Sequence, residues 1–189
     1  MTSIRNFNEL NDYINFLCKQ PANLFSPSFF NLHLKQVEIN SLSLAEKLGA
    51  DRDVVQVSSI IHDISAITDF SKLKHHESEG VLLAREILKD YPLSKQQKEK
   101  VFHCIETHSQ PIAIGADISE AVCVSNADAI SQIIQPIYWM FYIFNVRKFG
   151  FEDGYNWYKQ RIESHLNVLI EPAKKIAESK YNQSLLYFK

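Results

Sequence analysis

The chain has 189 residues, of which 46% are hydrophobic and 22% charged, which suits one globular domain with a sizeable core. A formal net charge of -2 argues against charge-driven binding along nucleic acid, so no extended nucleic-acid surface is expected. No apolar run is long enough to cross a bilayer, and no basic segment leads into an apolar one near the N-terminus. We therefore expect a cytoplasmic protein that does not bind membranes.

The elements follow from helical spacing of apolar residues, and the low content of glycine (5) and proline (6) also favours helices. Ser26-Pro27 is a typical helix start and Gly49 a typical stop. The predicted helices cover about 7–18, 27–48, 51–64, 76–88, 95–108, 118–134 and 155 onwards, with a loop at 65–74 and an aromatic-rich segment at 138–149 interrupted by Gly150 and Gly154.

No segment shows the alternating pattern of a strand, so we expect an all-α, single-domain helical bundle of about seven or eight helices over residues 1–189. Its core would lie at about 26–135, followed by a C-terminal helical part at about 136–189. The three cysteines, Cys18, Cys104 and Cys123, are widely spaced in apolar surroundings. They are typical of reduced core residues rather than of disulfides or thiolate metal ligands.

An adjacent pair, His62-Asp63, ends an apolar run in the third predicted helix. Consecutive helical residues point about 100° apart, so both side chains can reach one ion only from a helix end or a seam between helices. Neither group is easily buried alone, and a bound cation would satisfy both. A single His-Asp pair is nevertheless a weak signal for a metal site.

Four further residues of metal-ligand type lie on separate predicted helices. They are His33, His76, His108 and Asp128. Helical bundles build metal sites from ligands that project inward from several facing helices. Asp128 stands in an apolar-rich helix, where an unpaired carboxylate is almost never buried. Imidazole and carboxylate ligands without thiolate suit a catalytic transition metal or a magnesium-like ion rather than structural zinc.

In chain order these six residues resemble the signature of the HD-domain superfamily of metal-dependent phosphohydrolases. The local contexts are similar too, in Ile60-Ile61-His62-Asp63-Ile64, His76-Glu77-Ser78-Glu79-Gly80, Ile105-Glu106-Thr107-His108 and Ala127-Asp128. The resemblance covers His33 to Asp128, about half of the chain. The C-terminal part resembles no family.

The resemblance implies one or two divalent metal ions, with Mn, Fe, Zn, Co, Ni and Mg all open. A first ion would be held by His33, His62, Asp63 and Asp128, and a second by His76 and His108 with Asp63 bridging. Asp63, His76 and His108 would also be the catalytic residues. The remaining candidates are expected to lie outside the ligand set: His75, His103, His165, Asp69 and Asp117.

Two departures from the family pattern concern phosphate binding. Gln36 stands where many members have Arg, and Ser65-Ala66 stands where many have Gly-Lys after His-Asp-Ile. A familiar phosphate-contacting cation is thus missing, and we expect Lys72 or Lys74 to bind the substrate instead.

The resulting prediction is a metal-dependent phosphohydrolase that cleaves a small phosphorylated substrate, by resemblance a nucleotide, with metal-activated water. The alternatives are a di-iron oxygenase of the same superfamily and a non-catalytic, nucleotide-binding regulatory protein. The aromatic segment at 138–149 favours core packing or a homodimer contact over base stacking, and Arg147 and Lys148 are weaker candidates for an anion contact.

Overall fold

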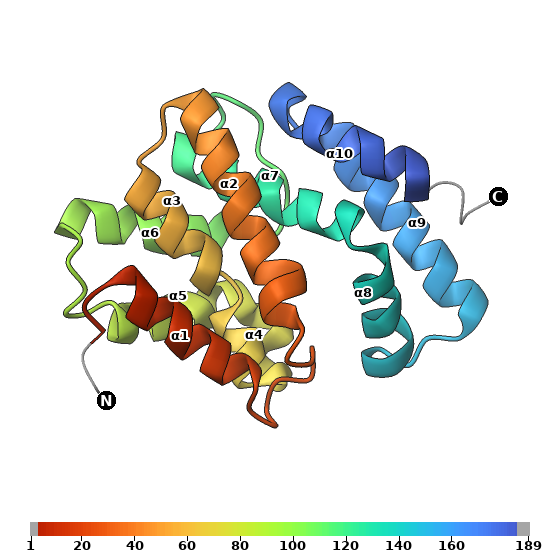
Figure 1. Ribbon diagram of the computed structural model, residues 1–189, viewed down its shortest axis with the longest axis horizontal. Helices are drawn as coiled ribbons and strands as arrows, with labels where there is room; N and C mark the ends of the chain where they lie inside the picture. Colours follow the sequence, from red (N-terminus) through yellow and green to blue (C-terminus); the bar gives the residue numbers. More distant parts are fainter. Residues whose placement is uncertain (1–3, 185–189) are drawn as a thin grey trace.

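The computed structural model describes residues 4–184, except the side chains of 179, 180, 183 and 184, and every regular element in this range is helical (Figure 1). The α-helices are α1 Phe7–Cys18, α2 Lys35–Leu48, α3 Arg52–Ile61, α4 Ile64–Thr68, α5 His76–Ile87, α6 Lys95–Thr107, α7 Ser119–Ile134, α8 Pro136–Phe141, α9 Phe151–Val168 and α10 Glu171–Ser184. Shorter segments are η1 Phe30–Leu34, η2 Phe70–His75 and η3 Tyr142–Val146. Eight α-helices in the described range have ten residues or more, which confirms the predicted all-α class.

Helix α7 lies at the centre of the fold. It is buried from Glu120 to Ile133, as expected for a helix that is apolar around most of its circumference. It packs against α2, α3 and α6 on one side and against α9 and α10 of the C-terminal part (Figure 1). Asp128 is therefore carried into the middle of the molecule by the most buried helix.

Local signals in the sequence explain several helix ends. Gly49 ends α2 in the left-handed conformation (φ 65°), which costs glycine nothing sterically. The Asp51 carboxylate caps α3 by accepting the backbone N–H groups of Asp53 and Val54. Ser94 and Gln97 form a reciprocal capping box at the start of α6.

The predicted helix at 27–48 begins differently. Ser26 has a positive φ of 74°, and the chain then forms the π-helical segment η1 before α2 starts. His33 lies in this π-helical turn, a local geometry that is frequent at functional sites.

Two other predicted boundaries were wrong. The expected loop at 65–74 contains α4 and η2, because Ile64 and Ile67 are buried and the Asp69 carboxylate caps η2. The expected single final helix is two helices, α9 and α10. The chain turns between them where the Ile170 N–H donates to Asn126 Oδ1 at 3.0 Å.

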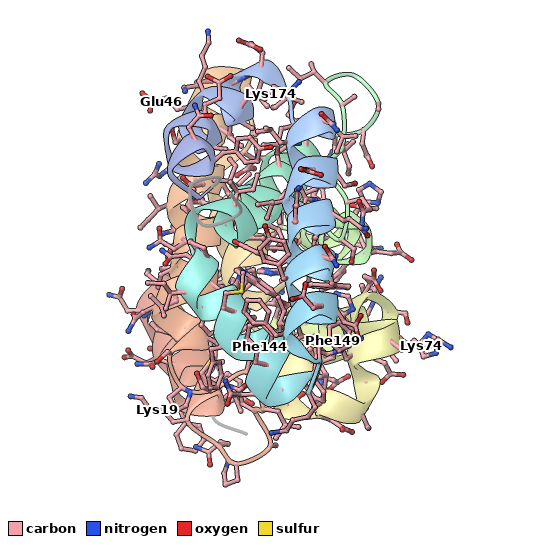
Figure 2. The ribbon with its side chains drawn as sticks, turned by 90° about the vertical axis from the view of Figure 1, so that its right-hand side faces the viewer. Lys19, Glu46, Lys74, Phe144, Phe149 and Lys174 are labelled. Carbon is pink, nitrogen blue, oxygen red and sulfur yellow. The ribbon has the colours of Figure 1, made fainter. Side chains whose placement is uncertain are left out.

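Gly154 lies inside α9 instead of interrupting the helix. A Cβ there would come within 2.5 Å of Ile143 Cγ2 and 2.7 Å of Phe144 Cε1. The missing side chain lets α9 approach η3 closely, and Figure 2 shows Phe144 beside these elements.

The three cysteines are buried and free, as predicted for reduced core residues. Burial raises the pKa of each thiol to about 12, so none is a thiolate at neutral pH. Within residues 4–184, no helix is both long enough and apolar enough to cross a bilayer.

Candidate metal centre and its cavity

His62 and Asp63 lie at a break between two helices. α3 ends at Ile61, and α4 begins at Ile64. Asp63 leaves the α-helical conformation (φ -98°, ψ 18°), so its carboxylate turns toward the His62 ring, with Oδ2 3.3 Å from Nε2. The break between the helices thus lets the side chains of two consecutive residues point to the same place.

The close approach of α5 brings His76 to the same place. A Cβ on Gly80 would lie 3.1 Å from Ile105 Cγ2 and 3.5 Å from the His62 carbonyl oxygen, so glycine allows tight packing there. The Ser65 hydroxyl donates to the His76 carbonyl at 2.7 Å and holds the start of α5. Ser65, a departure from the family pattern, therefore has a structural role.

The four histidines present their Nε2 atoms to a common centre, because each Nδ1 is occupied. The Nδ1 partners, at 2.7 to 2.9 Å, are the carbonyl oxygens of Ser59, Leu73 and Ile105 for His62, His76 and His108, and the Ser131 hydroxyl for His33. A carbonyl can only accept, and the Ser131 hydroxyl itself donates to the Asp128 carbonyl, so each Nδ1 carries the proton. When such a ring is neutral, its Nε2 lone pair is free, as in metal-binding histidines.

Asp63 divides this centre into two halves. Its Oδ2 lies 3.3 Å from Nε2 of both His33 and His62. Its Oδ1 lies 3.5 Å from His76 Nε2 and 3.6 Å from His108 Nε2. One carboxylate thus faces both halves with different oxygens, an arrangement that suits a bridging ligand.

Asp128 completes the first half. Its Oδ1 lies 3.4 Å from His33 Nε2 and 4.0 Å from His62 Nε2. Its Oδ2 accepts the amide N–H of Gln132, one helical turn away, at 3.1 Å. This bond fixes the orientation of the carboxylate.

The electrostatics of the cluster favour an added positive charge. Burial would raise the pKa values of Asp63 and Asp128, but the facing histidines lower both. Burial would likewise lower the pKa of His62, but Asp63 and then Asp128 outweigh it and raise that pKa to about 9. The centre therefore needs compensating positive charge, which a proton or a cation can supply.

The short distances between histidine nitrogens also suit a bound divalent cation. The Nε2 atoms of His33 and His62 are 3.1 Å apart, as are those of His76 and His108. Two facing lone pairs repel each other at this distance unless a proton or a cation lies between them. Two overlapping groups, His33-His62-Asp128 and His62-Asp63-His108, have ligand atoms within 4.8 Å of one another. The N/O ligand set suits transition metals or Mg²⁺.

The cluster forms one wall of a cavity of about 200 Å³ that opens to solvent. Besides five of the six candidate ligands, its wall contains Phe25, Leu73, Ser109, Gln132, Trp139, Tyr142, Arg147, Trp157 and Arg161. Several of these residues come from the aromatic segment and from α9. The aromatic segment therefore forms part of the cavity wall as well as part of the core.

The expectation that Lys72 and Lys74 bind substrate finds no support in the structure. Lys72 Nζ pairs with Glu79 at 2.8 Å, and neither lysine is among the described residues that line the cavity. Figure 2 shows Lys74 pointing outward from the body of the molecule. Arginines from the C-terminal part, Arg147 and Arg161, lie in the wall instead.

From the sequence, Arg147 was only a weak candidate for an anion contact, and Gln132 and Arg161 were not candidates. Gln132 could have been found, because position i+4 from Asp128 lies on the same helix face. Arg161 had no such local signal. His103 lies apart from the cluster and pairs with Asp117 at 2.7 Å.

Comparison with known proteins agrees with this arrangement. A family model described as HD domain matches residues 32–133, which include all six candidate ligands. Ribonuclease Y of Mesoplasma florum is 33% identical over 103 residues, which make up 53% of this chain but only 18% of that protein. The chain thus matches less than a fifth of this relative.

Solved structures are similar over nearly the whole chain. Bacillus subtilis YpgQ in complex with ADP has a TM-score of 0.68 at 18% identity, covering 94% of this chain and 93% of that one. A predicted HD superfamily hydrolase from an uncultured Thermotogales bacterium has a TM-score of 0.67 at 17% identity, covering 100% and 92%. At these identities the likeness establishes a shared fold, including the C-terminal helices.

Proposed function

The chain belongs to the HD-domain family, and from this premise we propose that it is a metal-dependent phosphohydrolase acting on a nucleotide or another small phosphate ester. The observation that carries the proposal is the convergence of four Nε2 atoms and two carboxylates at the wall of an open cavity. A buried cluster that served the fold alone would not need such a cavity beside it.

One divalent ion would be held by His33, His62, Asp63 and Asp128, and a second by His76 and His108 together with Asp63. When bound, the metal supplies hydroxide at neutral pH and withdraws charge from the phosphoryl oxygens. In each ring the Nδ1 hydrogen bond holds one proton on Nδ1 and fixes the ring orientation, so Nε2 is the atom that would bind the ion.

Two residues at the cavity wall can bind the reacting group or move its proton. The Ser109 hydroxyl donates to Glu77 and lies 3.4 Å from His76 Nε2. Ser109 and His76 both line the cavity, so they can reach a leaving group that enters from solvent. Where only one ion binds, His76 and His108 remain available as proton-transfer groups.

The cavity also suits a nucleotide. The aromatic rings of Trp139, Tyr142 and Trp157 line it together with the polar cluster. YpgQ, which has the same fold, was crystallised with ADP. These observations support a nucleotide over an aliphatic phosphate.

The test is phosphate release from a panel of nucleotides and simple phosphate esters by purified protein with defined divalent metals. His108→Gln should lower turnover by at least ~100-fold, because it removes a group placed among the reacting atoms. His103→Gln, on the same helix but paired with Asp117, is the matched control and should keep activity. Phosphate release unchanged in His108→Gln would refute the assignment.

Metal content and turnover distinguish the two alternative functions. Two iron atoms per chain with oxygen-dependent turnover would favour the oxygenase. Tight nucleotide binding without any turnover would favour the regulatory protein.

A further inference from the structure

Arg147 and Arg161 have no ion-pair partner among the side chains that the structure describes, although both line the cavity that contains the metal-ligand cluster. Some surface cations are paired instead, such as Lys72 with Glu79 and Arg85 with Glu99. Two unpaired guanidinium groups in a cavity are suited to an anionic ligand.

Arg161 is held in place by its neighbours. Its Nε–H donates to Gln132 Oε1, and its guanidinium lies 5.3 Å from the centroid of the Trp157 ring. The other end of the Gln132 amide donates to Asp128 Oδ2. A single side chain therefore links Arg161 to a candidate metal ligand. Among the described residues no hydrogen bond uses the Arg161 Nη atoms, whose four N–H bonds can serve an anion.

Arg147 is less constrained. Its Nη1 lies 3.5 Å from the Tyr142 hydroxyl, its guanidinium stacks 5.2 Å from the Phe149 ring, and the residue is exposed. It can move toward a bound ligand, whereas Arg161 is already oriented. Both arginines lie outside residues 32–133, the range of the family match. The C-terminal helices thus add cationic groups to a metal centre built by the rest of the chain.

We propose that this cavity binds a substrate with at least two linked phosphate groups, such as a nucleoside diphosphate or triphosphate. This inference rests on the proposed function. The reacting phosphoryl group lies against the His/Asp cluster, and a neighbouring phosphate is bound by Arg161, with Arg147 as the outer contact. Gln132 lies between Arg161 and Asp128, so a group bound at the cluster and a group bound at Arg161 would occupy neighbouring positions, as two linked phosphates do.

The test measures equilibrium binding to the metal-loaded protein, so it does not depend on turnover. Isothermal titration calorimetry would compare hydrolysis-resistant α,β-methylene-ADP with AMP for wild type, Arg161→Gln, Arg161→Lys and Arg147→Gln. Arg85→Gln, which removes a surface ion pair, is the matched control. We expect wild type to bind the diphosphate at least ~10-fold more tightly than AMP, since one charge-assisted contact is worth about that factor.

Arg161→Gln should abolish most of this preference while changing AMP affinity less than ~3-fold, and Arg161→Lys should restore part of it. Arg147→Gln should have a smaller effect because Arg147 is exposed. Binding of inorganic pyrophosphate tests whether two linked phosphates are sufficient or the nucleoside is also needed. The proposal is supported if Arg161 contributes to the binding of α,β-methylene-ADP or of pyrophosphate. Equal affinity of wild type for AMP and the diphosphate would overturn it, as would an equal loss for both ligands in Arg161→Gln.

The two proposals can fail separately. If no phosphate ester is hydrolysed but the Arg161-dependent preference is found, the proposed function is wrong and the cavity still binds linked phosphates. If hydrolysis occurs without that preference, only the present inference is wrong.

Discussion

Replacing Asp63 with asparagine should remove most of the metal affinity of this protein. Asp63 is the only described side chain whose oxygens face both halves of the centre, at 3.3 Å on one side and 3.5 to 3.6 Å on the other. Asparagine preserves the shape of the side chain but removes its charge and one of its two acceptor oxygens. The half formed by His76 and His108 then keeps only two ligands.

The magnitude follows from ligand loss. Removing a partner outside the ligand set typically costs ~10–100-fold in metal affinity, so ~100-fold is a lower bound for a bridging carboxylate. At a metal concentration of about 100 times Kd, binding stabilises the wild type by about 2.7 kcal/mol, which raises Tm by roughly 5–10 °C for a chain of this size. At the same concentration the variant would gain only about 0.4 kcal/mol, or ~1 °C.

The assay combines thermal unfolding, with chelator and with added metal, and elemental analysis of the purified protein. Asp69→Asn is the matched control, because Asp69 caps η2 and lies outside the centre. Metal content should fall in Asp63→Asn and stay unchanged in Asp69→Asn. A variant with wild-type metal content and the same rise in Tm would refute the assignment of Asp63 as the bridging ligand.

Three further predictions concern the surroundings of the centre. Gly154→Ala should lower the free energy of unfolding by about 1–3 kcal/mol, because the added Cβ would lie 2.5 Å from a methyl group of Ile143. Gly150→Ala is the control: its Cβ would meet open space, so urea denaturation should change little. Gln132→Leu should weaken metal binding ~10–100-fold in a competitive titration, because the buried Asp128 loses its amide donor; unchanged affinity would argue against this orienting role. Burial, with help from a nearby guanidinium, lowers the pKa of His165 from 6.5 to about 4, so the unfolded chain takes up the proton first as the pH falls. The contribution of His165 to the free energy of unfolding should therefore be complete above pH 6.5 and lower by about 2 kcal/mol at pH 5. Urea denaturation in the presence of chelator measures this free energy, and its pH dependence should be correspondingly weaker in His165→Asn.

Local patterns were sufficient for most helices, because capping and apolar spacing act over a few residues. Gly49 marks a helix end that the structure reproduces, and Asp51 and Ser94 cap α3 and α6 close to the predicted starts of these helices. The π-helical turn at His33 was not predictable in this way. Its geometry accompanies long-range contacts, such as the hydrogen bond between His33 and Ser131, which are 98 residues apart in the chain.

The positions of Lys72 and Lys74 relative to the cavity also depend on tertiary contacts that local sequence does not reveal. Lys72 and Lys74 are near the metal ligands in sequence, but Lys72 is engaged by Glu79 and neither lines the cavity. Arg161 is 33 residues beyond Asp128 in sequence and is linked to it through the Gln132 side chain. Distance along the chain was therefore a poor guide to which cation faces the site.

The sequence alone determined the set of candidate metal ligands, because the residue types of these six residues and their order along the chain are local facts. It also determined the helical class, since the 3.6-residue period of apolar side chains is a local property. Only the tertiary structure decided which oxygen of Asp63 faces which histidines, and which arginines meet the metal ligands in one cavity. Those relations depend on how α7 packs between the N-terminal helices and α9, and such packing is set by contacts between residues far apart in the chain.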